Sequence, residues 1–181
     1  MIIFDIDDVL LDWSKSFDIF LRNEKDYIDE PVQTSTKRIP EILNTTPDEA
    51  NKIMLEHNES CYFKHMDIKG DSNLIIDFNY SEPIIGITSC GITDTIIKAR
   101  LENIRAKFGM KITKIIHLEL HQNKFEVLTR FNKIYKNVYY LDDNIRNIEY
   151  GDSIGINSFV YLTKFNQNLI KDTIKYVYNM K

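Results

Sequence analysis

Two clusters of acidic residues, far apart in the sequence, stand directly after short apolar runs. The first cluster contains Asp5, Asp7 and Asp8, and the second contains Asp142 and Asp143. Carboxylates this close repel one another by several kcal/mol where the dielectric constant is low. A hard divalent cation such as Mg²⁺ takes oxygen ligands and accepts few from the protein. The clusters therefore indicate a magnesium site with one carboxylate left free for chemistry.

Other polar residues stand beside apolar runs of the same kind. Thr88 and Ser89 follow the run 84–87, and Lys124 opens a segment of helical periodicity. A single acidic pair after a strand is more often a turn or a helix cap. Groups at the carboxyl ends of neighbouring parallel strands, however, share one crevice. We therefore expect these residues to join the acidic clusters in one site.

The frame that positions these residues follows from an alternation of apolar runs and helix-periodic segments. Strands are expected at 2–4, 84–88, 112–118 and 137–141, and within 154–162. Helices are expected at 14–22, 94–108 and 145–150, from Thr46, from Lys124, and at the end of the chain with Leu169, Ile170, Ile174 and Val177. This alternation predicts an α/β fold, with a Rossmann-like parallel sheet flanked by helices.

The segment 14–72 is mainly helical and interrupts the alternation. Thr46 and Glu49 fit the N-cap and the acidic partner of a capping box. We expect residues 1–13 and 73–181 to form the catalytic core. Residues 14–72 would then be a small helical cap inserted after the first strand.

Aromatic residues recur at helical spacing at the start of this cap. Trp13, Phe17 and Phe20 would share one helix face. Packing inside the cap is the favoured interpretation, and stacking on a substrate is the alternative. His57, Cys61 and His65 lie four residues apart, but packing or surface roles are favoured over metal binding.

Taken in order, these segments resemble the haloacid dehalogenase (HAD) superfamily of phosphohydrolases. FDIDDVL (4–10) matches the first family motif, an Asp-x-Asp closely followed by Val or Thr, and IIGITS (84–89) matches the second. Lys124 stands where the third motif places a lysine, and YYLDDN (139–144) matches the acidic fourth motif. The first and fourth motifs together carry the resemblance. A receiver domain of the response-regulator kind would end with the lysine instead of an acidic pair.

The resemblance implies a Mg²⁺-dependent phosphomonoester hydrolase that works through an aspartyl-phosphate. Asp5 matches the family nucleophile, and Asp7 matches the family acid/base, which disfavours a dehalogenase. The metal would be held by Asp5, the Asp7 backbone carbonyl and Asp142. Asp143 would lie behind Asp142 or act through a water molecule. Thr88, Ser89 and Lys124 would bind the substrate phosphate.

Within the superfamily, DIDDVLLDW (5–13) and the following aromatic-rich helix are most similar to the 5'(3')-deoxyribonucleotidases. A small phosphorylated substrate is therefore expected, with (deoxy)nucleoside monophosphates favoured, and Trp13, Phe17 and Phe20 are candidates to contact the base. A phosphatase for other small metabolites or for nucleic-acid 3'-phosphate ends is the alternative. A phosphate-ligand binding protein without turnover is a third interpretation.

The composition of the chain bears on its partners, its compartment and its association with membranes. The 181 residues carry a formal net charge of −4, which disfavours a nucleic-acid partner without excluding one. Cys61 and Cys90 are too few for a disulfide scaffold, so a reducing cytoplasm is expected. The sequence offers no basic leader and no apolar run near the roughly 20 residues that a membrane span requires. The oligomeric state is left open.

Overall fold

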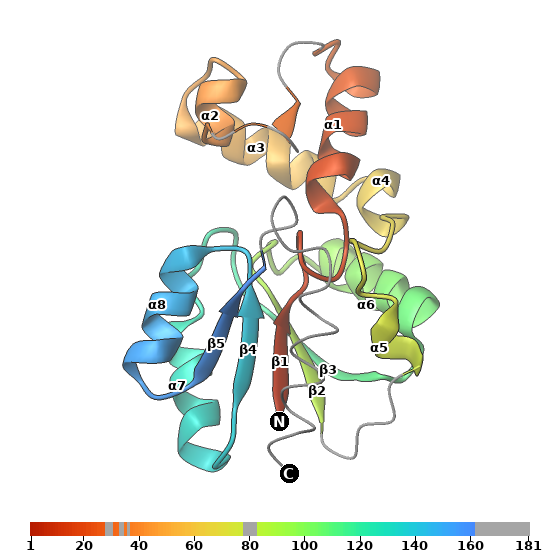
Figure 1. The fold of residues 1–181 in the computed structure, drawn as a ribbon. Coiled ribbons are helices and arrows are strands. Elements are labelled where there is room, and N and C mark those ends of the chain that lie inside the picture. Colours follow the sequence, from red (N-terminus) through yellow and green to blue (C-terminus); the bar gives the residue numbers. More distant parts are fainter. Residues whose placement is uncertain (28–30, 33–34, 36, 78–82, 162–181) are drawn as a thin grey trace.

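A five-stranded parallel sheet forms the centre of the computed structural model, which describes residues 1–27, 31–32, 35, 37–77 and 83–161. The strands are β1 (Ile2–Asp5), β2 (Ile84–Thr88), β3 (Ile112–His117), β4 (Tyr139–Asp142) and β5 (Asn157–Val160). Their order is β3-β2-β1-β4-β5 (Figure 1). The chain therefore builds one side of the sheet from β1 and then returns to build the other. Ligands of such sheets bind where the order reverses, here at the carboxyl ends of β1 and β4.

Helices cover both faces of this sheet. The core helices are α5 (Leu74–Asp77), α6 (Asp94–Phe108), α7 (Phe125–Ile134) and α8 (Ile145–Ser153). Phe4 of β1 packs in one apolar cluster with Phe108 of α6. Ile3 faces the other way and packs in a second cluster with Leu128 of α7 and Ile148 of α8. The three inner strands β1, β2 and β4 are therefore buried along their whole length, and the expected α/β fold with a Rossmann-like parallel sheet is confirmed.

Helix α6 begins and ends where the sequence predicts. The Thr93 side chain accepts a hydrogen bond from the backbone N–H of Ile96 at 3.3 Å, which caps the first turn. Gly109 follows the last turn with φ +56°, a backbone conformation that L side chains rarely adopt. These two ends fix which residues of α6 face the sheet.

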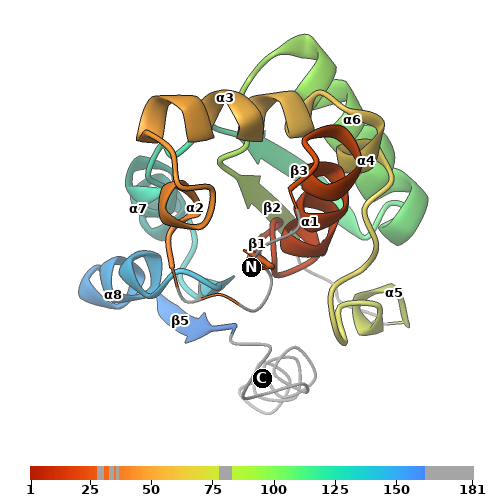
Figure 2. The ribbon, with the colours of Figure 1, turned by 90° about the horizontal axis from the view of Figure 1, so that it is seen from above.

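Four further helices lie over the carboxyl edge of the sheet (Figures 1 and 2). They are α1 (Trp13–Glu24), α2 (Ile39–Ile42), α3 (Pro47–Asn58) and α4 (Cys61–Lys64). The hydroxyl of Thr46 accepts a hydrogen bond from the backbone N–H of Glu49 at 3.2 Å, so α3 starts at the expected N-cap. These helices occupy the segment expected to form the cap.

The chain leaves the core and returns to it through two adjacent segments. Leu11 and Ile68 form an antiparallel bridge between them. Lys69 is buried at this junction, with Nζ 3.1 Å from Asp8 and 2.7 Å from Asp12. Asp8, the third acid of the first cluster, therefore shares a counter-ion with Asp12 at the junction and is not one of the three acids that converge at Asp5.

A buried histidine surrounded by aromatic rings forms the interior of the cap. The ring centroids of Trp13, Phe17, Phe20 and Phe63 lie 5.3–5.9 Å from that of His57. Burial lowers the pKa of His57 to about 4, so the ring is neutral near pH 7. Phe17 and Phe20 thus lie in the packing of the cap interior, and His57 has the packing role that the sequence favours.

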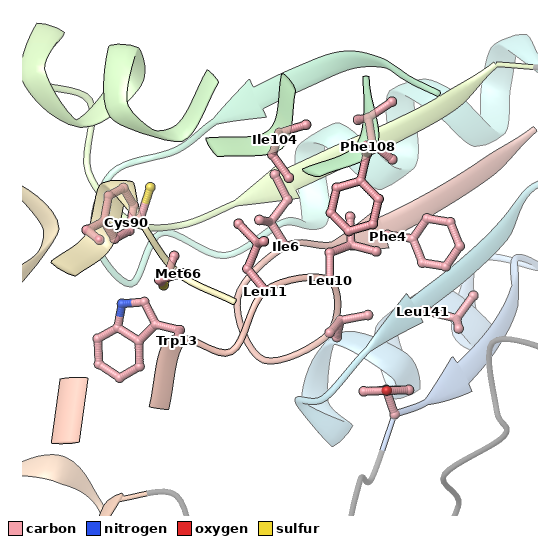
Figure 3. Packing of buried hydrophobic residues seen from close by; sticks show 14 of the residues in the cluster. Phe4, Ile6, Leu10, Leu11, Trp13, Met66, Cys90, Ile104, Phe108 and Leu141 are labelled. Atoms are coloured by element: carbon pink, nitrogen blue, oxygen red, sulfur yellow. The ribbon is translucent and has the colours of Figure 1, made fainter. Parts of the chain in front are cut away.

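One apolar cluster joins the cap to the core. Figure 3 shows its side chains extending from Phe4 and Phe108 through Leu10 to Trp13 and Met66. Packing at interior density resists displacement of any one member. The position of α1 is therefore tied to that of β1.

Two further expectations from the sequence concern the terminal helix and membrane-spanning segments. The terminal helix carrying Leu169, Ile170, Ile174 and Val177 lies outside the described residues. Among the described residues, no helix combines the length and the apolar character that crossing a bilayer requires.

Candidate active site

A buried lysine joins the ends of the two central strands. β1 ends at Asp5 and its neighbour β4 ends at Asp142. Nζ of Lys124, the residue just before α7, lies 2.6 Å from Oδ2 of Asp5 and 2.7 Å from Oδ2 of Asp142. Burial opposes the charge of Lys124, but the two carboxylates outweigh it and raise the pKa above its usual range. The lysine is therefore a fixed positive charge in the site.

The Asp142 carboxylate is held by a dense set of donors. Besides Lys124, its oxygens accept from the Tyr140 hydroxyl, from the Asn144 backbone N–H at 2.7 Å and from Asn147 Nδ2 at 2.9 Å. Tyr140 was not singled out from the sequence, although residues two apart on a strand share a face. Asn147 lies one turn into α8, where no spacing rule indicates it. These bonds fix the orientation of Asp142.

A metal ion would fit at this point. Asp5, Asp142 and Asp143 each offer an oxygen, and these atoms lie within 4.8 Å of one another. Three carboxylates and the Lys124 ammonium carry a net charge of −2, which one divalent cation neutralises. All the donors are oxygens, the set that Mg²⁺ prefers.

The pKa values of these acids show the repulsion that a cation would relieve. Burial raises the pKa of Asp5 well above its usual range, Lys124 opposes this, and the charge of Asp142 adds to it. The pKa of Asp143, which is exposed at the cleft, is raised above its usual range by partial desolvation of its carboxyl group and by the neighbouring Asp142 charge. A bound divalent cation reverses such shifts, because it favours the ionised carboxylates.

An open cleft of about 550 Å³ lies over this cluster. Asp5, Lys124 and Asp143 line it, together with Asp7, Asp8, Ser89, His121, Gln122, Asn123, Phe125, Asn144, Arg146 and Asn147. The Ser89 hydroxyl donates to the Gln122 carbonyl at 2.8 Å. Asp143 reaches the cleft, whereas Asp142 is fully buried behind it. Both remain candidate ligands.

Asp7 lines the same cleft as Asp5 and Asp143 but has different partners. Its Oδ2 accepts a hydrogen bond from the Thr88 hydroxyl at 2.6 Å, and its Oδ1 is paired with Arg100 of α6. Thr88, the expected phosphate-binding residue, is fully buried and its hydroxyl is directed at Asp7. Arg100 was not identified from the sequence, because nothing in its position distinguishes it from any arginine on a helix.

A smaller recess of about 140 Å³ adjoins the cleft on the cap side. Its walls are Trp13, Met54, Asn58, Cys90 and Leu120, and it shares Asp7, Ser89 and His121 with the cleft. Trp13 Nε1 donates to Asn58 Oδ1 at 2.9 Å, which fixes the indole ring at this wall. Of the three aromatic candidates for substrate contact, Trp13 therefore lies beside Asp7.

Comparison with known proteins places the fold. No family model and no curated protein matches the chain. A haloacid dehalogenase-like hydrolase from Streptococcus pneumoniae has a TM-score of 0.64 at 13% identity, over 96% of this chain and 90% of that one. A HAD-superfamily hydrolase from Ehrlichia chaffeensis has a TM-score of 0.55 at 16% identity, covering 97% and 95%. A dehalogenase has a TM-score of 0.61 at 10% identity, covering 91% and 85%. The chain therefore has the fold of HAD-like hydrolases.

Proposed function

We propose that the chain is a Mg²⁺-dependent phosphomonoester hydrolase of the HAD type that works through an aspartyl-phosphate on Asp5. The observation that carries this proposal is the cluster of Asp5, Asp142, Asp143 and Lys124 at the carboxyl ends of β1 and β4. A cluster with a net charge of −2 and an open cleft above it suits one divalent cation and a phosphate group.

In the first step, an Asp5 oxygen attacks phosphorus and the bond from phosphorus to the leaving oxygen breaks. A carboxylate is a weak nucleophile, so the rate depends on positioning and on neutralisation of the phosphate charge. Lys124, 2.6 Å from Asp5, supplies a fixed positive charge beside the reacting atoms. Bound Mg²⁺ would add further positive charge at the phosphate oxygens.

Asp7 is the proposed acid/base, because it lines the same cleft as Asp5 and also borders the recess. Asp7, protonated when the substrate is bound, gives this proton to the leaving oxygen as the ester bond breaks and becomes a carboxylate. It then takes a proton from the water that attacks phosphorus of the aspartyl-phosphate, which releases phosphate and restores Asp5. A positioned acid/base contributes about 10²–10⁴-fold to the rate of such steps.

The substrate phosphate would lie in the cleft against the Asp5–Lys124 ion pair, with Ser89 at the same cleft. The Thr88 hydroxyl can reach a phosphate oxygen only by leaving Asp7.

The leaving group would lie in the recess beside Asp7. Trp13 borders this recess, and the resemblance of DIDDVLLDW (5–13) to the deoxyribonucleotidases favours a nucleoside monophosphate over a sugar phosphate. Among the cleft residues, Arg146 and Lys124 are the cations, and Lys124 is already paired with two acids. A long nucleic acid would need more unpaired positive charge than this.

Release of inorganic phosphate from a substrate panel tests the proposal. The panel contains nucleoside monophosphates, sugar phosphates and 3'-phosphorylated oligonucleotides, each assayed with Mg²⁺ and with EDTA. We expect (deoxy)nucleoside monophosphates to react fastest, and we expect EDTA to lower the rate by at least about 100-fold. Excess Mg²⁺ should restore it, which controls for damage by EDTA.

Other outcomes assign other functions. Preference for sugar phosphates or for oligonucleotides would keep the chemistry and replace the proposed substrate. Trp13 is the single tryptophan of the chain, so its fluorescence reports binding at the recess without turnover. A nucleotide-dependent change in that signal with no phosphate released would support a phosphate-ligand binding protein and contradict the enzyme.

A further inference from the structure

Arg100 is a fully buried guanidinium group in the middle of α6. Its Nη2 pairs with Oδ1 of Asp7, whereas Nε and Nη1 have no hydrogen-bond partner among the described residues. A buried charge with so few partners is costly to a folded protein. Stability alone therefore does not account for an arginine at this position.

The attachment of the cap to α6 uses a different residue. Asn103, one turn further along α6, donates to the carbonyls of Phe63, Lys64 and Met66. These bonds fasten α4 and the segment after it to the core. Arg100 takes no part in these three hydrogen bonds, so its pairing with Asp7 requires another explanation.

The guanidinium also contacts the cap. The Arg100 Cζ atom lies 4.0 Å from the centroid of the Phe63 ring in α4. An arginine over an aromatic face is attracted to it by the ring quadrupole, and more strongly when both groups are desolvated. Arg100 thus contacts both Phe63 of the cap and Asp7 of the site.

Both oxygens of Asp7 are engaged, one by Arg100 and one by Thr88. Two donors from different elements, α6 and β2, fix the plane of the carboxylate. Proton transfer is sensitive to this plane, since the acid must lie within hydrogen-bond distance of the leaving oxygen.

We propose that Arg100 is a positioning residue for Asp7, holding the carboxylate in the orientation that protonates the leaving group, with Phe63 keeping the guanidinium in place. This inference rests on the proposed phosphohydrolase function. It predicts that loss of Arg100 lowers kcat/KM most for the substrates whose leaving group most needs a proton.

The test compares kcat/KM for an alkyl phosphate, whose leaving oxygen needs a proton, with that for p-nitrophenyl phosphate, whose leaving group needs none. We expect Arg100→Met to lower the alkyl value by about 100-fold and the aryl value by less than about 10-fold. Arg100→Lys, which keeps the charge, should recover part of the alkyl activity. Arg105→Met, on the exposed side of the same helix, should change neither.

A double-mutant cycle with Asp7→Asn separates positioning from a structural role. If Arg100 acts through Asp7, adding Arg100→Met to Asp7→Asn should lower the alkyl value by less than about 3-fold more. Should Arg100→Met fail to fold, Phe63→Leu removes the ring contact and keeps Arg100. The Phe63→Leu variant should show the same preference for the aryl substrate, with a smaller loss of kcat/KM for the alkyl phosphate.

Each remaining outcome overturns the inference. Equal losses on both substrates would assign Arg100 to structure alone and leave the proposed function intact. A rise in alkyl activity would mean that the ion pair restrains Asp7 away from the substrate. Absence of turnover of both substrates by the unaltered protein would remove the proposed function and the inference together.

Discussion

Asp5→Asn should lower Mg²⁺-dependent turnover by at least about 10⁴-fold, the scale of loss when one of a set of catalytic groups acting together is removed. Asparagine has nearly the same shape as aspartate, but its amide oxygen does not form an acyl phosphate. The altered protein should remain folded, since it loses one of three clustered negative charges. Initial rates with the best substrate of the panel, together with thermal unfolding, measure both effects.

The control is Asp48→Asn, the same chemical change at an exposed position in the first turn of α3. Its turnover should match that of the unaltered protein. If Asp5→Asn retains a rate within about 10-fold of normal, a group other than Asp5 attacks phosphorus.

Lys124→Met should affect both stability and turnover. Without Lys124, the buried Asp5 and Asp142 carboxylates lose the cation that they share. Removing one partner of a buried ion pair costs about 3–5 kcal/mol, so the free energy of unfolding without Mg²⁺ should fall by that amount. Turnover should fall by about 10²–10³-fold, as for loss of one group that stabilises developing charge.

Urea unfolding with EDTA and with Mg²⁺ measures the stability effect. Mg²⁺ should recover part of the lost stability, because a bound cation neutralises the same carboxylates. Lys133→Met is the matched control, since Lys133 is exposed on the same helix α7. Equal stability of the two variants in EDTA would show that the cluster does not need Lys124.

The sequence was sufficient to predict the sheet and the end at which the site lies. Apolar runs such as 84–88 alternate with helix-periodic segments such as 94–108, and parallel strands bring their carboxyl ends to one edge. Asp5 and Asp142 are the last residues of adjacent strands, so strand order alone brings them together. The resemblance to the HAD superfamily added the position of Lys124.

Other features depend on tertiary contacts that no local pattern records. Asp8 resembles a member of the acidic cluster, but Lys69, 61 residues away, neutralises it at the cap junction. Arg100 reaches Asp7 across 93 residues, and only the packing of α6 on the sheet brings them together. Whether Phe17 would face a substrate depended on the orientation of α1, which His57 and the other rings determine.

The central claim is that Asp5 becomes phosphorylated in a site that carboxylates of β1 and β4 share with Lys124. Asp7→Asn should trap this intermediate, because p-nitrophenyl phosphate needs no acid to lose its leaving group, whereas hydrolysis of the aspartyl-phosphate needs the base. Acid quenching after mixing with Mg²⁺, followed by mass spectrometry of the peptides, measures it directly. The account predicts one added phosphoryl group on Asp5, and p-nitrophenol released without phosphorylated Asp5 would contradict it.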